Sequence, residues 1–436
     1  MRWQASHRLG KYMKESLWVV PALALLAGGF LAIIDVAFVE GHINLPHSWQ
    51  YSAGTASTVL AAVVSAMVGL TGIVVAVAVL IIQMATGTLS PRYMRIWFRD
   101  PLQKAVLAGF LGTLAFAYAL LRNIDGGGQV PNLGVSLAGV SLAVSMILFL
   151  YYIDHFAHLL RPVGLSAYVS GAGAKVIRSF WGGLEAAGIV AVGDRAREGS
   201  SAEEQSALAV RSTRAGVVQA MDQPGLLGLA TGHHCRFAVR CTIGDFVLQG
   251  DPLLEVYGTE TPPSEDAIRR RFALGTERAF EQDTAFALRI VVDIAIRALS
   301  PAVNDPTTGV QLLDHIEGLL LLIGERELAD RYELRDDGGR SRVVFRSRTW
   351  EDYLTLGVTE ILEYGSTSTQ VTRRLRALLE RLLESVHPAN RQAVRAQLAR
   401  LDAALEADVP DGVRREFASR ADRQGLGGPG RSTDER

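Results

Sequence analysis

Four long apolar segments lie in the first third of the chain, and the two-thirds that follow contain no such segment. The second is the clearest, because no Asp, Glu, Lys or Arg occurs at positions 41–91. A helix of about 20 apolar residues crosses the hydrocarbon core of a bilayer. The pattern therefore predicts an integral membrane protein with a large C-terminal part outside the lipid.

The predicted fold class is an α-helical membrane bundle of four transmembrane helices followed by an α+β cytoplasmic part. The four spans are expected at residues 17–38, 58–85, 105–121 and 133–153. Lys and Arg gather before the first span and between the second and third, whereas the loop at 39–57 has neither. Since such residues favour the cytoplasmic side, we expect a multi-pass protein of the cell inner membrane with both termini in the cytoplasm.

Composition along the chain predicts five parts. They are a four-span transmembrane domain at 1–160, a helical connector at 161–207, a β-rich module at 208–262, a helical cytoplasmic domain at 263–408 and a disordered tail at 409–436. The tail is rich in glycine, which is typical of segments that do not bury a core.

Small residues form a stripe in the second predicted span. Ser65, Gly69, Gly72 and Ala76 follow helical spacing, and Gln83 continues the same face. Small faces let helix backbones approach closely in lipid, so packing within the bundle is the favoured interpretation. The alternative is a pore wall or oligomer axis, where small residues leave room for ions or water.

Few polar residues near the lipid suggest chemistry. Asp35 is the only ionisable residue other than histidine within a predicted span, near its outer end, and is either a functional acid or a solvated interfacial group. His155 and His158 follow Asp154 at a spacing that could bring two imidazoles to one metal. Juxtamembrane packing is the favoured interpretation of the histidines, because further ligands are not in view.

Short β-branched runs punctuated by Gly, Asp and Pro predict strands at 215–256. The pattern Gly-Asp-x-Val-x-x-Gly-x-x-Leu that begins at Gly244 resembles half of a biotinyl or lipoyl barrel-sandwich module. A carrier version needs a lysine, but no lysine follows Lys175, so the resemblance implies a shape and no cofactor. His233, Cys235 and Cys241 would share a face of an extended strand, which fits a buried strand better than an incomplete zinc site.

The segment at 281–308 predicts a helical hairpin. Asp293 and Arg297 lie one turn apart on the first helix, and Ser300 before Pro301 ends it. Asn304 precedes Asp305, which is a good N-cap for a second helix with Pro306 at its first position.

A family resemblance rests on this segment. Gln282-Asp283, Arg297-Ala-Leu-Ser300-Pro301 and Asn304-Asp305-Pro306, together with the four spans and the later Trp350-Glu351-Asp352, resemble a family of bacterial predicted membrane proteins, domain of unknown function 2254. The similarity covers nearly the whole chain apart from the tail. It implies a topology and brings no established activity.

Three amphipathic helices are expected after the hairpin. Thr349-x-x-Asp352 is a capping-box variant that opens a helix to about residue 363, and helices follow at 367–386 and 390–406. Apolar residues at spacings of three and four make these helices suitable partners in a bundle or an oligomer.

The remaining features limit the function. A net charge of −1 gives no field that favours nucleic acid, and the chain has no Walker motif, dinucleotide fingerprint or Gly-x-Ser-x-Gly. Asp283, Asp293 and Asp305 are explained by capping and ion pairing, so we expect no enzyme, cofactor or metal. The favoured function is an oligomeric channel-like or transport-associated protein with a cytoplasmic regulatory domain. The alternative is a membrane-anchored sensor or scaffold that binds a cytosolic protein or small ligand.

Overall fold

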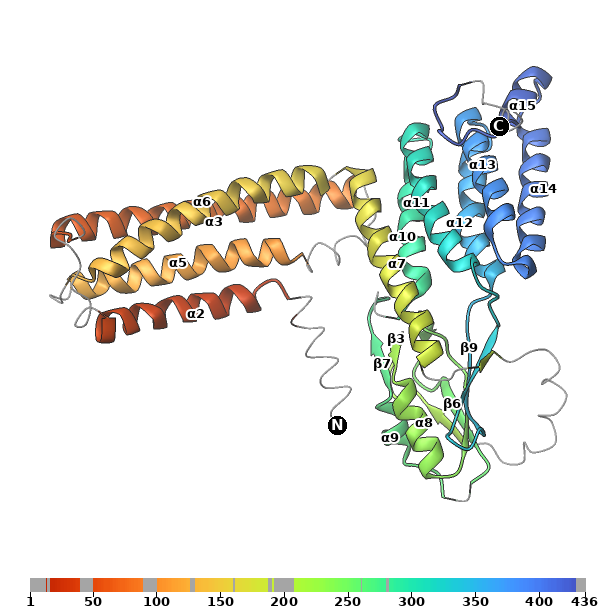
Figure 1. Ribbon diagram of the computed structural model, residues 1–436, viewed down its shortest axis with the longest axis horizontal. Helices are drawn as coiled ribbons and strands as arrows, with labels where there is room; N and C mark the ends of the chain where they lie inside the picture. The colour runs from red at the N-terminus through yellow and green to blue at the C-terminus, as the bar shows by residue number, and fades with distance from the viewer. Residues whose placement is uncertain are drawn as a thin grey trace. The chain divides into compact units, whose positions relative to one another are not determined.

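The computed structural model separates into two compact units, Arg8–Arg161 and the part from Pro162 onward (Figure 1). The structure describes residues 13, 16–39, 50–88, 100–125, 130–159, 161–186, 190–191, 208–259, 261–279 and 282–428. The basic residues at 2–14 and 92–99, on which the expected orientation depends, lie outside these ranges, so the orientation stays a prediction.

Four helices form the first unit, and all four are long and apolar enough to cross a membrane. They are α2 (Val19–Ile34), α3 (Ala53–Thr88), α5 (Pro101–Asp125) and α6 (Asn132–Leu159). The helix α2 continues into a π-helical turn, η1 (Asp35–Val39). The four predicted spans are therefore confirmed as helices, and three of them extend several residues further than the apolar pattern indicated.

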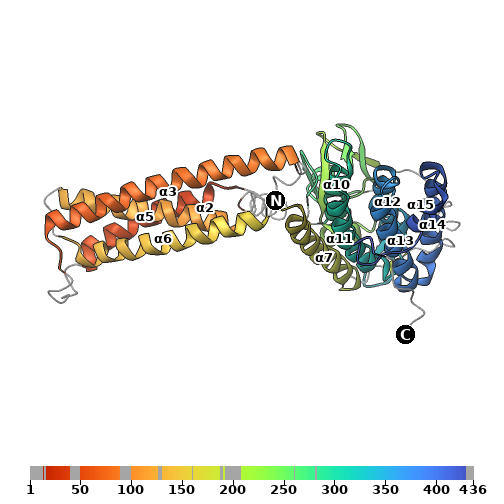
Figure 2. The ribbon, with the colours of Figure 1, turned by 90° about the horizontal axis from the view of Figure 1, so that it is seen from above.

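The helix α5 organises this unit, since α2, α3 and α6 all pack against it (Figure 2). The contact with α2 is the closest, because a Cβ placed on Gly28 would lie 2.2 Å from the carbonyl oxygen of Gly112. Only glycine allows two helix backbones to approach so closely. The α2–α5 pair is thus fixed by two residues that have no side chain.

Polar contacts fix the start of α5. Asp100 accepts a hydrogen bond from the backbone N–H of Leu102 at 2.8 Å, and its other oxygen lies 3.0 Å from His155 Nε2. His158 Nε2 lies 3.6 Å from an oxygen of Asp154. Each imidazole therefore has its own carboxylate partner, which agrees with the structural interpretation of these histidines.

The second unit contains two open β-sheets. One has the strand order β1-β8-β9-β4-β6-β2 and the other β5-β3-β7. The strands are β1 (Val190–Ala191), β2 (Leu208–Arg211), β3 (Gly216–Met221), β4 (Arg236–Val239), β5 (Phe246–Val247), β6 (Pro252–Tyr257), β7 (Phe272–Gly275), β8 (Arg331–Arg335) and β9 (Ser341–Arg346).

The barrel-sandwich module expected at 208–262 is not confirmed, because neither sheet closes on itself among the described residues. The reason lies in β4, which pairs in parallel with β9 from more than a hundred residues further along the chain. Strands of the expected module therefore join the β8–β9 hairpin in one larger sheet. The helix α8 (Gln223–Gly232) also separates β3 from β4.

Helices make up the rest of this unit (Figure 1). They are α7 (Pro162–Ala186), α9 (Glu265–Arg269), α10 (Thr284–Leu299), α11 (Pro306–Gly324), α12 (Trp350–Gly365), α13 (Thr369–Ser385), a 3-10 turn η5 (Pro388–Asn390), α14 (Arg391–Asp408) and α15 (Gly412–Ala418). The helix α7 packs along α10 and α11.

The predicted helix ends are largely confirmed. Asp305 accepts a hydrogen bond from the backbone N–H of Thr308 at 3.0 Å, and Pro306 begins α11. Ser300 ends α10 in an extended conformation, as a residue before proline should. The capping box of Thr349 and Asp352 at the start of α12 is present in full.

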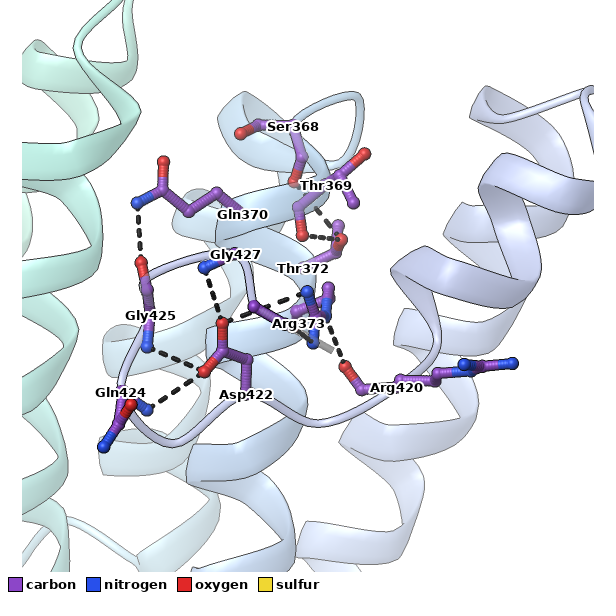
Figure 3. A network of polar contacts seen from close by, with 11 residues as sticks. Ser368, Thr369, Gln370, Thr372, Arg373, Arg420, Asp422, Gln424, Gly425 and Gly427 are labelled. Carbon is purple, nitrogen blue, oxygen red and sulfur yellow. Dashed lines mark hydrogen bonds and ion pairs between the residues drawn. The ribbon is translucent and has the colours of Figure 1, made fainter. Parts of the chain in front are cut away.

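The first part of the tail differs from the disorder expected at 409–436. Residues 409–428 contain α15 and a segment that folds back on α13 (Figure 3). The guanidinium of Arg373, whose side chain is fully buried, donates to the carbonyl oxygens of Arg420 at 3.0 Å and Gly428 at 2.7 Å. Asp422 organises the same segment by accepting hydrogen bonds from three backbone N–H groups. We call residues 420–428 the tail latch.

Candidate functional site

The small-residue stripe of α3 faces away from its own bundle. Ser65, Gly69, Gly72, Ala76 and Gln83 are all exposed in the protomer, and a Cβ placed on Gly69 or Gly72 would have no neighbour within 4 Å. The described protomer therefore does not pack this stripe inside its own bundle, and what the stripe contacts stays a prediction.

The physical reason is that a different face of α3 makes the bundle contacts. Met67, Leu70 and Val74 are among the buried residues of this helix. At roughly 100° per residue, Ser65 lies about 180° from Val74 around the helix axis. The stripe is thus opposite the packed face and is open to lipid or to another protein.

The family motif does not form one site. The helix α10 has 16 residues and is about 24 Å long at 1.5 Å per residue. Gln282 and Asp283 precede its first residue, whereas Ser300, Pro301, Asn304, Asp305 and Pro306 form the corner after its last. The motif therefore marks both ends of one helix, and the first end borders a pocket.

The pocket at the first end, which we call the motif pocket, is where α7, the sheets and α12 meet α10. Its lining residues are Phe180, Met221, Gln223, Cys241, Thr242, Ile243, Gln282, Asp283, Thr284, Phe345, Arg346, Ser347, Arg348 and Tyr353.

Gln282 joins the end of β3 to the start of α10 at this pocket. Its side-chain oxygen accepts a hydrogen bond from the backbone N–H of Met221 at 2.9 Å, and its nitrogen donates to the Met221 carbonyl at 3.3 Å. The amide of glutamine matches a backbone peptide group in both donor and acceptor. Gln282 thus continues the strand pairing with a side chain and fixes the helix against the sheet.

Asp283 is a buried acid beside two arginines. Its carboxylate accepts a hydrogen bond from Arg278 Nε at 2.7 Å. Burial raises the pKa of Asp283, and the charges of Arg278 and Arg348 act in the opposite direction. Thr284 hydrogen-bonds the hydroxyl of Tyr353, whose pKa burial raises to about 12. The pocket is therefore lined by the carboxyl group of Asp283, the guanidinium of Arg348 and the phenol hydroxyl of Tyr353.

The size of the motif pocket limits what it can hold. Its volume is about 40 Å³, and a water molecule occupies about 30 Å³ in the liquid. Such a space takes water or a small inorganic ion. Within the described residues, no three His, Cys, Asp or Glu side chains group as metal ligands.

The group considered for zinc is spread over two elements. His233 ends α8, and its Nδ1 lies 3.1 Å from the carbonyl oxygen of Thr261. Cys235 and Cys241 are buried on either side of β4, and burial raises their pKa values to about 11 and about 12. The two buried thiols fit the interpretation of a buried strand.

A charged cluster on α10 was only partly visible in the sequence. Arg289 Nε donates to Asp293 at 2.6 Å, and its Nη2 donates to Glu360 of α12 at 2.9 Å. Sequence spacing placed Asp293 one turn from Arg297 and did not indicate Arg289 or Glu360. A four-residue spacing from Arg289 to Asp293 was the signal for the first contact.

Comparison with known proteins agrees with this architecture. Residues 14–381 match the family model described as Predicted membrane protein (DUF2254). Uncharacterized proteins of Mycobacterium tuberculosis (strain ATCC 25618 / H37Rv) and Mycobacterium bovis (strain ATCC BAA-935 / AF2122/97) are each 28% identical over 439 residues, which cover 97% of this chain and 81% of each relative.

No solved structure matches the chain significantly. The family match contains the four membrane helices, both sheets and most of α13, and it ends before the tail latch. Because it covers well over half of the chain, the protein belongs to the predicted membrane protein family DUF2254.

Proposed function

We propose that the protein is a homo-oligomeric, channel-like protein of the inner membrane in which the α3 stripes of several protomers meet around an axis. The unit from Pro162 onward is the regulatory part on the cytoplasmic side. The proposal assigns no catalytic step, cofactor or metal to the chain.

The observation that carries the proposal is the exposure of the stripe on the face of α3 opposite the bundle. Glycine in the interior of a helix destabilises it by roughly 1 kcal/mol relative to alanine. Two glycines on a face that contacts only lipid would therefore destabilise α3, and no contact would compensate for the loss. Small residues favour helix contacts in lipid because they allow close backbone approach. A second copy of α3 supplies such a contact.

An oligomer could also enclose a path for ions across the membrane. Four helices per protomer enclose little space, whereas closed symmetry can place one face of each protomer on a common axis. Ser65 and Gln83 give the stripe polar groups near its two ends. A ring of α3 helices would therefore present small and polar side chains to the axis.

The test is ion flux through the purified full-length protein in liposomes, with oligomer mass measured in parallel. Gly69→Leu and Gly72→Leu place bulky groups on the stripe, and Val75→Leu on another exposed face is the matched control. We expect the glycine variants to lose both assembly and K⁺ or Cl⁻ flux, while the control keeps both. Flux that survives both glycine substitutions would refute a stripe-lined pathway.

The motif pocket favours a second candidate function, that of a sensor. Arg346 and Arg348 line a space that fits a small inorganic ion. In this alternative, chloride or phosphate raises the melting temperature of the full-length protein, and Arg348→Gln removes the effect. Melting that does not respond to either anion would leave the sensor function without support.

A further inference from the structure

Two fully buried polar side chains lie within the membrane unit near the end where α5 begins. Gln103 of α5 and Tyr152 of α6 are each 0% exposed. Neither the amide of Gln103 nor the hydroxyl of Tyr152 has a hydrogen-bond partner among the residues that the structure describes. Such groups are costly inside a membrane bundle, because lipid supplies no donor or acceptor. The two side chains therefore point to a ligand that forms hydrogen bonds.

The helices α5 and α6 pack against each other in antiparallel directions. At one end, Oδ2 of Asp100, the residue before α5, lies 3.0 Å from Nε2 of His155 on α6. Nearer the middle, a Cβ placed on Gly109 would lie 3.7 Å from the side chain of Leu148. The contacts thus advance along α5 as they go back along α6, and they fix which residues of the two helices lie level.

This register brings Gln103 and Tyr152 to the same depth. Gln103 follows Asp100 by three residues and Tyr152 precedes His155 by three, which is about 4.5 Å along each helix at 1.5 Å per residue. Residues three apart on a helix share a face. The two unpartnered side chains are therefore level with each other, one turn further into the bundle than the pair of Asp100 and His155.

The surroundings of the two side chains are apolar. Val106 and Phe110 follow Gln103 on the same face of α5, and both are fully buried. On α6, the ring of Tyr152 lies 4.7 Å from that of Phe156, centre to centre. Polar groups in such surroundings are held in the interior and cannot turn out to the headgroups.

The chemistry of the side chains selects the ligand. The glutamine amide offers both N–H donors and a carbonyl acceptor, and a phenol hydroxyl both donates and accepts. A cation would contact only the oxygens, and an anion only the N–H and O–H groups. Asp100 supplies no free charge, because one oxygen accepts from the Leu102 N–H at 2.8 Å and the other contacts His155. Water both donates and accepts, and a buried water typically makes about three such bonds.

We infer that the start of α5 and the end of α6 form a water-binding site inside the membrane bundle, where water is held between Gln103 and Tyr152. His155, whose side chain is 33% exposed, lies between this site and the end of the bundle. Polar residues inside spans mark the paths of water and ions. The site gives each protomer a hydrated inlet from one membrane surface, whichever way the α3 stripes assemble.

Hydroxyl-radical footprinting of the full-length protein in lipid nanodiscs tests the site. Radiolysis converts water into hydroxyl radicals, which modify the side chains that contact it, and mass spectrometry locates the added oxygen. Phe110 is the internal reference, because it is also a fully buried aromatic residue. We expect Tyr152 to be modified roughly tenfold faster than Phe110, since held water contacts the tyrosine and not the phenylalanine.

Gln103→Leu distinguishes a held water from chance access of solvent. Leucine has about the volume of glutamine and forms no hydrogen bond, so the modification of Tyr152 should fall to the rate of Phe110. Leu120→Met, at a fully buried position further along α5, is the matched control and should leave the modification of Tyr152 unchanged.

Two results would overturn the inference. Equal modification of Tyr152 and Phe110 in the native chain means that the site is dry. Modification of Tyr152 that persists unchanged in Gln103→Leu means that solvent reaches the tyrosine without a water that Gln103 holds. The native comparison requires no substitution, so it remains decisive if Gln103→Leu fails to fold.

Discussion

The tail latch gives the sharpest prediction about stability. Arg373 on α13 is fully buried, and residues beyond the family match accept the hydrogen bonds of its guanidinium. Its guanidinium carbon lies 4.1 Å from the centre of the Phe417 ring. The guanidinium also donates to the two carbonyl oxygens, of which that of Arg420 is drawn in Figure 3. The perturbation is Arg373→Met, which keeps the length of the side chain and removes the charge.

The expected loss follows from these contacts. Two hydrogen bonds from a charged donor contribute roughly 1.5–3 kcal/mol each, and a desolvated cation–π contact contributes about 2 kcal/mol. The cost of burying a guanidinium, several kcal/mol, offsets about half of that sum. We therefore expect Arg373→Met to destabilise the latch by about 3 kcal/mol, which raises the open population about 100-fold.

Limited trypsin digestion of the full-length protein measures this opening, with cleavage after Arg420 and Arg423 followed by mass spectrometry. When opening is fast relative to cleavage, the rate follows the open population. Arg376→Met on the same helix is the matched control, because Arg376 pairs with the mostly exposed Asp402. A pair of that kind contributes at most about 1 kcal/mol, so cleavage should rise less than about fivefold. Equal cleavage of the native chain and Arg373→Met would refute the reasoning.

Three further predictions concern packing and pH. Asn390→Ala should destabilise the second unit by about 2 kcal/mol, measured by thermal melting, because Asn390 Nδ2 donates to the buried Gly324 carbonyl at 3.0 Å. Burial lowers the pKa of His315, so its contribution to stability is complete above pH 6.5 and is lost as pH falls. In His315→Gln, the melting temperature should therefore change less between pH 7.5 and pH 5.5 than it does in the native chain. Gly28→Val should separate α2 from α5, since even a Cβ would meet the Gly112 carbonyl, and size-exclusion chromatography should show aggregation.

Local patterns predicted the helices and their ends because the determining contacts lie within a few residues. Asp305 caps α11 and Thr349 with Asp352 caps α12 as their spacing indicated. The sheet was different, because the pairing of β4 with β9 joins segments far apart in the chain. No local pattern encodes such a partner, so the expected barrel-sandwich module did not appear.

Sites were predicted less completely than elements, for a related reason. Helical spacing showed that Gly69 and Gly72 share a face, but which face of a helix packs depends on its neighbours. Arg373 and Arg374 similarly belong to an amphipathic pattern in which arginine normally faces water. Their burial depends on the tail latch and on Glu317 of α11, which are distant in sequence.

The central claim is that the α3 stripes of two protomers meet, and disulfide cross-linking in native membranes tests it most directly. Gly69→Cys places a thiol on the stripe, and Val75→Cys places one about 120° away on another exposed face. The native Cys235 and Cys241 are buried, which leaves the introduced thiol as the reactive group among the cysteines. The account predicts that mild oxidation gives covalent dimers with Gly69→Cys and few with Val75→Cys. Dimers with Val75→Cys alone, or equal yields from both, would contradict it.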